Sequence, residues 1–334
     1  QIIENVKTTG EEFEIIVIDT KEPLDNTSEV CAEFGCRYIN QEEPCFGGAF
    51  RTGIKYAAFD KFLILDSDGS HNPKYIPDIY KMFTEQNKDI VIGSRYCEGG
   101  HTEDAKSSQM MSAVLNFAFR TALGFKVRDM STDYRMYKTE DLKNVELTCL
   151  NYDVLEEVLL KIKLNRPDKK LNVGETPITF SKRIFGDSKR KLIPFIIDYG
   201  KTLIKLSFMR FPTLKNFILY VFLGGLAFCL DYFIFLLLSK SLFSENPEIA
   251  NIISSFIGFL FTFTTNTFLN FKKKNKIAFR FVSYAMICVF GVFLTTLGIH
   301  LLKNTVDLKL LKFVLLVVVS CIQFVLNKMI TYRW

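Results

Sequence analysis

The sequence lacks three features that would narrow its function at once. Its eight cysteines include no C-x-x-C pair, so reduced, structural thiols are the simplest expectation. It has no large charge excess: 42 basic and 36 acidic residues give +6, which is too mild to suggest nucleic-acid binding but suits an anionic membrane surface. It opens at Gln1 with no Met and no signal-peptide pattern, inside a predicted helix, so we expect further residues upstream.

Apolar residues are abundant but unevenly placed. The chain of 334 residues is 49% hydrophobic and holds 33 phenylalanines, and the excess follows Phe217. This length and distribution predict a soluble domain over residues 1–186, amphipathic juxtamembrane helices over 187–215 and a membrane domain over 216–334.

The segment FLILDSDGSH, residues 62–71, carries the most informative pattern. Its apolar start predicts a buried parallel strand, and ligands in open α/β sheets bind where such strands end. Because side chains alternate along a strand, Asp66 and Asp68 would point to the same side and could hold one Mg²⁺ or Mn²⁺ ion. A pair of acids that caps the next helix is the plainer alternative.

Strands and helices alternate through the first half of the chain. This order predicts a doubly wound, mostly parallel sheet, with a mobile loop over the site at residues 97–107. The strands are expected at 13–18, 37–40, 62–65, 89–92 and 171–180, and the helices at 28–34, 47–57, 75–86, 112–123 and 153–163.

Two further segments could contact phosphate. Gly48, in a glycine pair that opens a helix, would let a phosphate approach the backbone, although a plain helix-entry turn is equally consistent. The basic segment SKRIFGDSKRK offers Arg183, Lys189 and Arg190 to phosphate oxygens, or a positive collar at a membrane surface.

The second half predicts an all-α domain of four membrane-spanning helices, at 217–239, 249–271, 279–302 and 310–330. A preceding helix, 189–210, would lie in the headgroup plane or pack on the soluble domain. Basic residues gather before the first span and between the second and third, which places the soluble half and the C-terminus in the cytoplasm. Asp231 should face the helix bundle, and the polar residues Asn266, Asn270, Gln323 and Asn327 should bond to one another.

Four motifs in the first half resemble a known family. LDSDGSH, IGSRY (92–96), DMSTDYRMY (129–137) and FSKRIFGDSK (180–189) are similar, in order and spacing, to the dolichol-phosphate mannose synthase-like branch of glycosyltransferase family 2. The likeness covers residues 1 to about 191, and the remainder resembles the GtrA-like membrane family.

The resemblance implies a GT-A-type, Rossmann-like fold that binds a nucleoside diphosphate sugar, a GDP- or UDP-hexose, and a divalent metal. It places Asp66 and Asp68 on the metal and diphosphate and Asp19 on the nucleoside. The catalytic set would be Asp66, Asp68, Arg95 and Arg183; the donor set Asp19, Asp66, Gly48 and Arg135; the acceptor-phosphate set Ser112, Arg183, Ser188 and Lys189. The chain departs from the family at Ser70, where glutamine is usual, and at Asp133, where glycine is usual.

These features predict a metal-dependent, inverting transfer of a hexose to a polyprenyl phosphate. Such a phosphate needs no general base, whereas a hydroxyl acceptor would need one, such as Asp129 or Asp133. The alternatives are transfer to a hydroxyl of a glycolipid or wall polymer, translocation of a lipid-linked sugar with a degenerate transferase domain, and a membrane-anchored binding module. No nucleic-acid partner is expected, and a homo-oligomer is left open.

Overall fold

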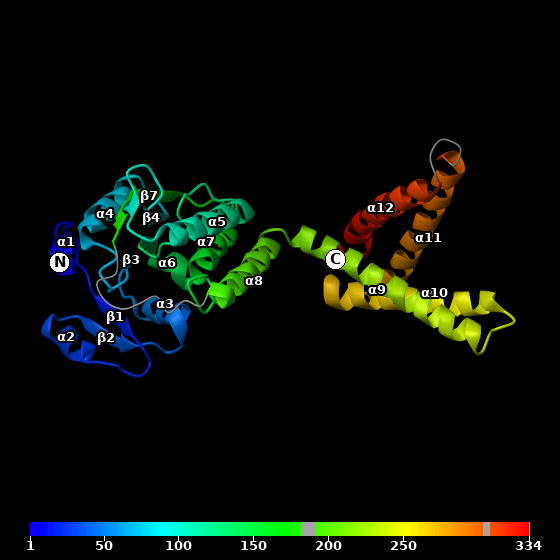
Figure 1. Cartoon of the computed structure of the whole chain (residues 1–334), viewed down its shortest axis with the longest axis horizontal. Helices are drawn as coiled ribbons and strands as arrows, with labels where there is room; N and C mark the ends of the chain where they lie inside the picture. The colour runs from blue at the N-terminus through cyan, green and yellow to red at the C-terminus, as the bar shows by residue number, and fades with distance from the viewer. Residues whose placement is uncertain (182–191, 303–307, 334) are drawn as a thin grey trace. The chain divides into compact units, whose positions relative to one another are not determined.

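The computed structural model divides the chain into two compact units, Gln1–Arg210 and Phe211–Trp334, and describes residues 1–181, 192–302 and 308–333 (Figure 1). The helix expected at the membrane face belongs to the first unit.

The first unit alternates strands and helices, as the sequence predicts. Its strands are β1 Ile16–Asp19, β2 Arg37–Asn40, β3 Lys61–Ile64, β4 Ile90–Ser94, β5 His101–Thr102, β6 Arg135–Lys138, β7 Val173–Pro177 and β8 Thr179–Phe180. Its helices are α1 Ile2–Lys7, α2 Thr27–Glu33, α3 Cys45–Tyr56, the short η1 Pro73–Tyr75, α4 Ile76–Glu85, α5 Lys106–Leu123, α6 Thr139–Lys143, α7 Val154–Asn165 and α8 Leu192–Arg210.

The main sheet has four strands in the order β3-β6-β4-β7. Strand β6 is antiparallel to both neighbours, whereas β4 and β7 are parallel, so β3, β4 and β7 all run the same way. The α/β fold with a mostly parallel sheet is thus confirmed, and β6 is its exception. Strands β1 and β2 form a separate parallel pair, which lies with α2 at the lower left of Figure 1.

Strand β4 shows why helices cover both faces of this sheet. Its residues Ile90, Val91 and Ile92 are all fully buried. Ile90 and Ile92 pack among residues of α3, α5, α7 and α8, whereas Val91 packs with residues of α4 on the opposite face. A strand buried on both faces needs a continuous apolar run, and the IVI segment supplies it.

The segment 97–107 differs from the predicted mobile loop. It contains β5, which pairs in parallel with β8, and α5 begins at Lys106, six residues before the expected helix start. The hydrogen bond from the His101 amide to the Ile178 carbonyl, at 2.9 Å, extends this pairing. The loop is short and polar, but its backbone is tied to the strand that precedes the basic segment.

Helix α8 packs on the soluble unit. Tyr199 and Leu206 are buried in its core, and the Thr202 hydroxyl donates to Asp153 at 2.6 Å. Ile196, Ile197 and Ile204 are more than half exposed, so α8 also carries apolar residues on its open side. Helix α8 thus packs on the soluble unit, as one of the two predictions has it, and its exposed apolar side is also compatible with a position in the headgroup plane.

The second unit consists of α9 Pro212–Lys240, α10 Pro247–Thr265, α11 Ile277–Leu302 and α12 Leu308–Leu326, with π-helical turns η2 Asn266–Asn270 and η3 Asn327–Thr331. Three stretches are long and apolar enough to cross a membrane: Pro212–Lys240, Ile249–Asn270 and Ile277–Leu302. A shorter apolar stretch, Val317–Thr331, covers part of the fourth expected span, so four crossings stay a prediction.

The polar residues of these helices are only partly paired as expected. Asn270 donates to Asn266 at 2.9 Å, but Asn327 lies 3.4 Å from the Tyr220 hydroxyl and Gln323 donates to the Ile287 carbonyl. The Asp231 carboxylate lies against Gly258 of α10, and its Oδ1 has no hydrogen-bond partner among the described residues. Asp231 therefore faces a neighbouring helix without a donor to that oxygen.

Candidate functional site

The two aspartates of the DSD motif lie beyond the strand that was expected to carry them. Strand β3 ends at Ile64, so the alternation of side chains along a strand does not place Asp66 and Asp68. The Asp66 amide instead donates to His71 Nδ1 at 3.0 Å. Asp68 Oδ1 accepts from the amide and hydroxyl of Ser70, at 3.0 and 2.5 Å. The motif is thus a compact turn whose two carboxylates have different surroundings.

A second loop brings another carboxylate to this turn. One donor atom each of Asp66, His71 and Asp133 lie within 4.8 Å of one another. His71 is 2% exposed and Asp133 is 4% exposed. His71 Nε2 and Asp133 Oδ2 are enclosed and have no hydrogen-bond partner among the described residues. We name Asp66, His71 and Asp133 the acid–histidine cluster.

The loop that carries Asp133 is held by side chains from two other elements. Glu175 of β7 accepts from the amides of Arg128 and Asp129 at 2.9 and 3.0 Å. Asn116 of α5 accepts from the Met130 amide at 2.9 Å. The position of Asp133 is therefore set before any ligand binds.

The same loop contains a buried ion pair with Arg95, which follows β4. Asp129 is fully buried and accepts from Arg95 Nε at 2.8 Å and Arg95 Nη2 at 2.9 Å. Arg95 Nη2 also donates to Ser131 Oγ at 2.7 Å. The Arg95 guanidinium carbon lies 5.3 Å from the centre of the Phe180 ring. This arrangement fixes Arg95 next to the strand that leads into the basic segment.

The end of β8 contacts the DSD turn directly. The rings of His71 and Phe180 meet edge to face with centroids 5.2 Å apart. The Ser181 amide donates to the Ser70 carbonyl at 3.1 Å. Residues 182–191 follow at once, and the predicted phosphate contacts Arg183, Ser188 and Lys189 lie outside the described residues.

The pKa values of Asp66 and Asp133 are shifted in the opposite direction to the pKa of Asp129. Burial, reinforced by the neighbouring Asp133 carboxylate, raises the pKa of Asp66 to about 8, and burial also raises the pKa of Asp133. Burial lowers the pKa of His71 to about 4, so its imidazole is neutral at pH 7. For Asp129, burial acts upward, but the Arg95 guanidinium outweighs it and holds the pKa below its ordinary value.

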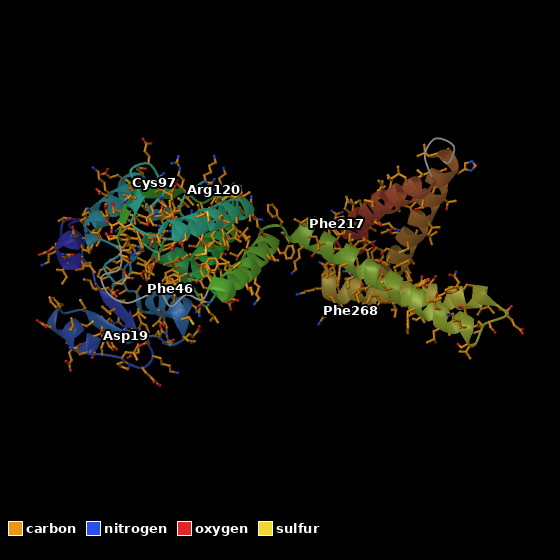
Figure 2. All side chains as sticks on the ribbon, in the orientation of Figure 1. Asp19, Phe46, Cys97, Arg120, Phe217 and Phe268 are labelled. Carbon is orange, nitrogen blue, oxygen red and sulfur yellow. The ribbon has the colours of Figure 1, made fainter. Side chains whose placement is uncertain are left out.

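Two predicted donor-binding residues lie on the first helices and strands. Asp19, labelled in Figure 2, ends β1 and accepts from the Tyr38 hydroxyl at 2.8 Å. A Cβ added at Gly48 would lie 2.0 Å from the Glu43 carbonyl oxygen, so Gly48 is required by close packing of its own helix entry. A contact between Gly48 and phosphate stays a prediction.

Two other predicted site residues have structural partners. Arg135 is fully buried, and its guanidinium donates to the carbonyls of Thr132, Leu155 and Met130. These contacts engage Arg135 in holding the Asp133 loop against α7. Ser112 of α5 lies beside the Tyr96 hydroxyl, next to Arg95.

His71 is a residue of the site that the sequence did not predict, and Asp133 was predicted as a base for a hydroxyl acceptor and as a departure from the family's usual glycine. Asp133 is 67 residues from Asp66 along the chain, and the antiparallel insertion of β6 beside β3 brings them together. A signal for His71 was present, because it lies in the turn that directly follows the motif.

The cluster has the chemistry expected for a divalent cation. Asp66 and Asp133 supply carboxylate oxygens, the ligands that Mg²⁺ and Mn²⁺ prefer, and Asp133 Oδ2 is enclosed without a donor among the described residues. A cation would neutralise the half-buried Asp66 carboxylate and the buried Asp133 carboxylate, which otherwise compete for a proton. The residues present therefore fit the predicted metal.

Comparisons with known proteins find matches for both the first and the second half of the chain. Residues 1–146 match the model for glycosyl transferase family 2, and residues 219–332 match the GtrA/DPMS transmembrane domain. The dolichol-phosphate mannosyltransferase of Pyrococcus furiosus is 31% identical over 191 residues, which cover 54% of this chain and 52% of that relative. The undecaprenyl-phosphate mannosyltransferase of Micrococcus luteus is 28% identical over 151 residues, which cover 43% of this chain and 59% of that relative.

The chain thus spans between half and three fifths of the length of these curated relatives. Among solved structures, glucosyl-3-phosphoglycerate synthase from Mycobacterium tuberculosis in complex with UDP has a TM-score of 0.45 and 17% identity, over 62% of this chain and 74% of that one. The same synthase with Mn²⁺, UDP and phosphoglyceric acid has a TM-score of 0.46 and 18% identity, over 62% and 72%. Residues 1–146 are thus similar to glycosyl transferase family 2, and residues 219–332 are similar to the GtrA/DPMS transmembrane domain.

Proposed function

We propose that the protein is a membrane-bound, inverting glycosyltransferase that moves a hexose from a nucleoside diphosphate sugar to a polyprenyl phosphate and requires a divalent cation. The observation that carries this proposal is the acid–histidine cluster at the end of β3, in a family 2 domain followed by a membrane domain. Acidic donors at a strand end suit a diphosphate and its cation.

The choice of acceptor follows from proton chemistry. A phosphate monoester with a second pKa of about 6 is largely dianionic at neutral pH, so it can attack the anomeric carbon without a general base. A hydroxyl acceptor needs a base whose pKa lies near the working pH. Asp129 is a poor base because Arg95 occupies both of its oxygens and holds its pKa low. Asp133, whose pKa burial raises, is then the candidate base for a hydroxyl acceptor, so the phosphate acceptor is proposed from the two relatives named as polyprenyl-phosphate mannosyltransferases.

The chain's own residues would position the two phosphate groups. Asp66 and Asp68 border the turn where the donor diphosphate would lie, and Arg183, Ser188 and Lys189 are expected to hold phosphate oxygens. The Ser181–Ser70 hydrogen bond supports this, because it starts the basic segment beside the DSD turn. A bound cation would supply charge neutralisation of the departing diphosphate.

The transferred sugar is proposed to be mannose. Both curated relatives are named as mannosyltransferases that use a polyprenyl phosphate, one dolichyl and one undecaprenyl. The donor is then a GDP- or UDP-hexose.

The second unit would bring the lipid to the active site. Its three long apolar helices and the GtrA/DPMS match make the protein an integral membrane protein. The clustered lysines at residues 272–274 favour a cytoplasmic position for that connection and for the soluble unit. The lipid phosphate would then meet the donor at the cytoplasmic face.

Mass analysis of lipid products tests this function. Membranes that contain the full chain are incubated with a panel of nucleotide sugars and polyprenyl phosphate. We expect one polyprenyl-phosphate hexose product, abolished by excess EDTA and absent from the Asp68→Ala variant, which should remain folded and membrane-bound. A product whose sugar linkage survives mild acid would indicate a hydroxyl acceptor instead. Absence of any transfer with every donor would contradict the enzyme assignment and favour a translocase.

A further inference from the structure

The hydrogen bond between the Asp66 amide and His71 Nδ1 determines where the imidazole carries its proton. At 3.0 Å this amide can only donate, so Nδ1 must accept and has no hydrogen. A neutral imidazole carries its one proton on the other nitrogen. His71 Nε2 is therefore an N–H donor inside the acid–histidine cluster.

This tautomer is the reverse of that in a metal-binding histidine. A ligating imidazole binds the ion through one lone pair, and its other ring nitrogen donates to a carboxylate, carbonyl or water. Here the other nitrogen accepts, and the enclosed Nε2 faces Asp133 Oδ1 at 3.6 Å. An ion at Nε2 would have to displace a proton or break the Asp66 hydrogen bond.

As far as the structure describes the chain, no proton or hydrogen bond of this kind hinders the binding of an ion by the Asp133 carboxylate. Asp133 is 96% buried, and its Oδ2 has no hydrogen-bond partner among the described residues. No lysine or arginine in the described part of the chain forms a salt bridge within 4.0 Å of Asp66 or Asp133. Asp66 is half-buried beside Asp133, and two carboxylates this close repel each other unless a cation or a proton lies between them.

We propose that a divalent cation binds between the carboxylates of Asp66 and Asp133, and that His71, whose Nε2 carries a proton, lies beside the ion without binding it. This deepens the proposed function, because it assigns the cation of that reaction to a pair other than Asp66 and Asp68. The ligand set is then all oxygen, which suits Mg²⁺ and Mn²⁺.

The rigidity of the Asp133 loop supports a binding role. Glu175, Asn116 and Arg135 fix this loop through its backbone, and Asp129 caps the amides of Ser131 and Thr132 at 3.2 Å. A carboxylate held this way loses little conformational freedom when the ion binds. Asp133 is thus a preorganised ligand.

Binding of Mn²⁺ to the detergent-solubilised full chain, without sugar donor or lipid, tests the assignment. Electron paramagnetic resonance titration gives the affinity, and electron spin echo modulation detects nitrogen bound directly to the ion. We expect Asp133→Asn to weaken Mn²⁺ binding at least tenfold and the exposed Asp78→Asn control to leave it unchanged. His71→Gln, which replaces a side chain that does not bind the ion, should weaken it less than fivefold. The wild-type spectrum should show no coordinated nitrogen.

Three results would overturn the proposal: wild-type affinity in Asp133→Asn, a coordinated-nitrogen signal, or no Mn²⁺ binding by the wild type. Should Asp133→Asn fail to fold, anomalous scattering from Mn²⁺ in wild-type crystals decides the site, and an ion away from Asp133 contradicts it. A protein that binds Mn²⁺ as expected but transfers no sugar would contradict the proposed function and leave this assignment standing.

Discussion

Asp129 and Asp133 lie on one loop and are both almost completely buried, yet their carboxylates have opposite surroundings. Asp129 accepts from the Arg95 guanidinium and from the amides of Arg95, Ser131 and Thr132. Asp133 faces Asp66 and a neutral histidine, and its Oδ2 lacks a partner among the described residues. A buried charge that has all its partners is destabilising once one of them is removed, whereas a buried carboxylate without partners indicates a ligand.

The largest expected effect on stability comes from breaking the buried ion pair between Arg95 and Asp129. Arg95→Met leaves the Asp129 carboxylate buried without its cation, and removal of one partner from a buried pair costs about 3–5 kcal/mol. The free energy of unfolding of the detergent-solubilised full chain measures this loss. Arg128→Met, which removes an exposed arginine from the same loop, is the control and should stay within about 0.5 kcal/mol of the wild type. Equal stability of the two variants would contradict a structural role for the pair.

Removing the charge of Asp66, which lies beside Asp133, should instead increase the stability of the protein at high pH. The folded state raises the pKa of Asp66 from 3.8 to about 8, so it binds that proton more tightly than the unfolded chain does. Without a cation, the contribution of Asp66 to stability is therefore fully present below about pH 4 and is lost as the pH rises through 8. Asp66→Asn removes the charge that causes this loss and should be more stable than the wild type at pH 8 in EDTA.

Thermal unfolding of the full chain in EDTA, across pH 5 to 8, measures this difference. The gap between the wild type and Asp66→Asn should widen with pH. Saturating Mn²⁺ should narrow it by stabilising only the wild type. The exposed Asp78→Asn variant should follow the wild type throughout, and a constant gap at all pH values would argue against an uncompensated carboxylate at Asp66.

The contrast also explains which parts of the site could be predicted from the sequence. Local patterns were sufficient for β3 and β4, because an apolar run followed by polar residues determines its own strand end, but they did not predict how Asp66 and Asp68 lie in the turn after β3. The same holds for the long apolar helices α9 and α11. Each of these features depends on neighbours along the chain.

The pairings that give each acid its character are not local. Asp129 meets Arg95 across 34 residues, and Asp133 meets Asp66 across 67, because β6 inserts antiparallel between β3 and β4. No periodicity in the segment 129–138 indicates the direction of that insertion. The roles of Gly48 and Arg135 likewise depend on backbone approaches, to Glu43 and Leu155, that become visible only in three dimensions.

The smallest expected effect on stability comes from removing one hydrogen bond of Arg95 while its ion pair with Asp129 stays intact. Ser131→Ala removes one acceptor of Arg95 Nη2, at 2.7 Å, but that nitrogen still donates to Asp129 at 2.9 Å. The loss should be about 1 kcal/mol of unfolding free energy, the usual net value of a single hydrogen bond. Mn²⁺ affinity should not change, because Asp129 still caps the Thr132 amide and so keeps Asp133 in place. A loss as large as that of Arg95→Met would mean that Ser131, and not the ion pair, holds the loop.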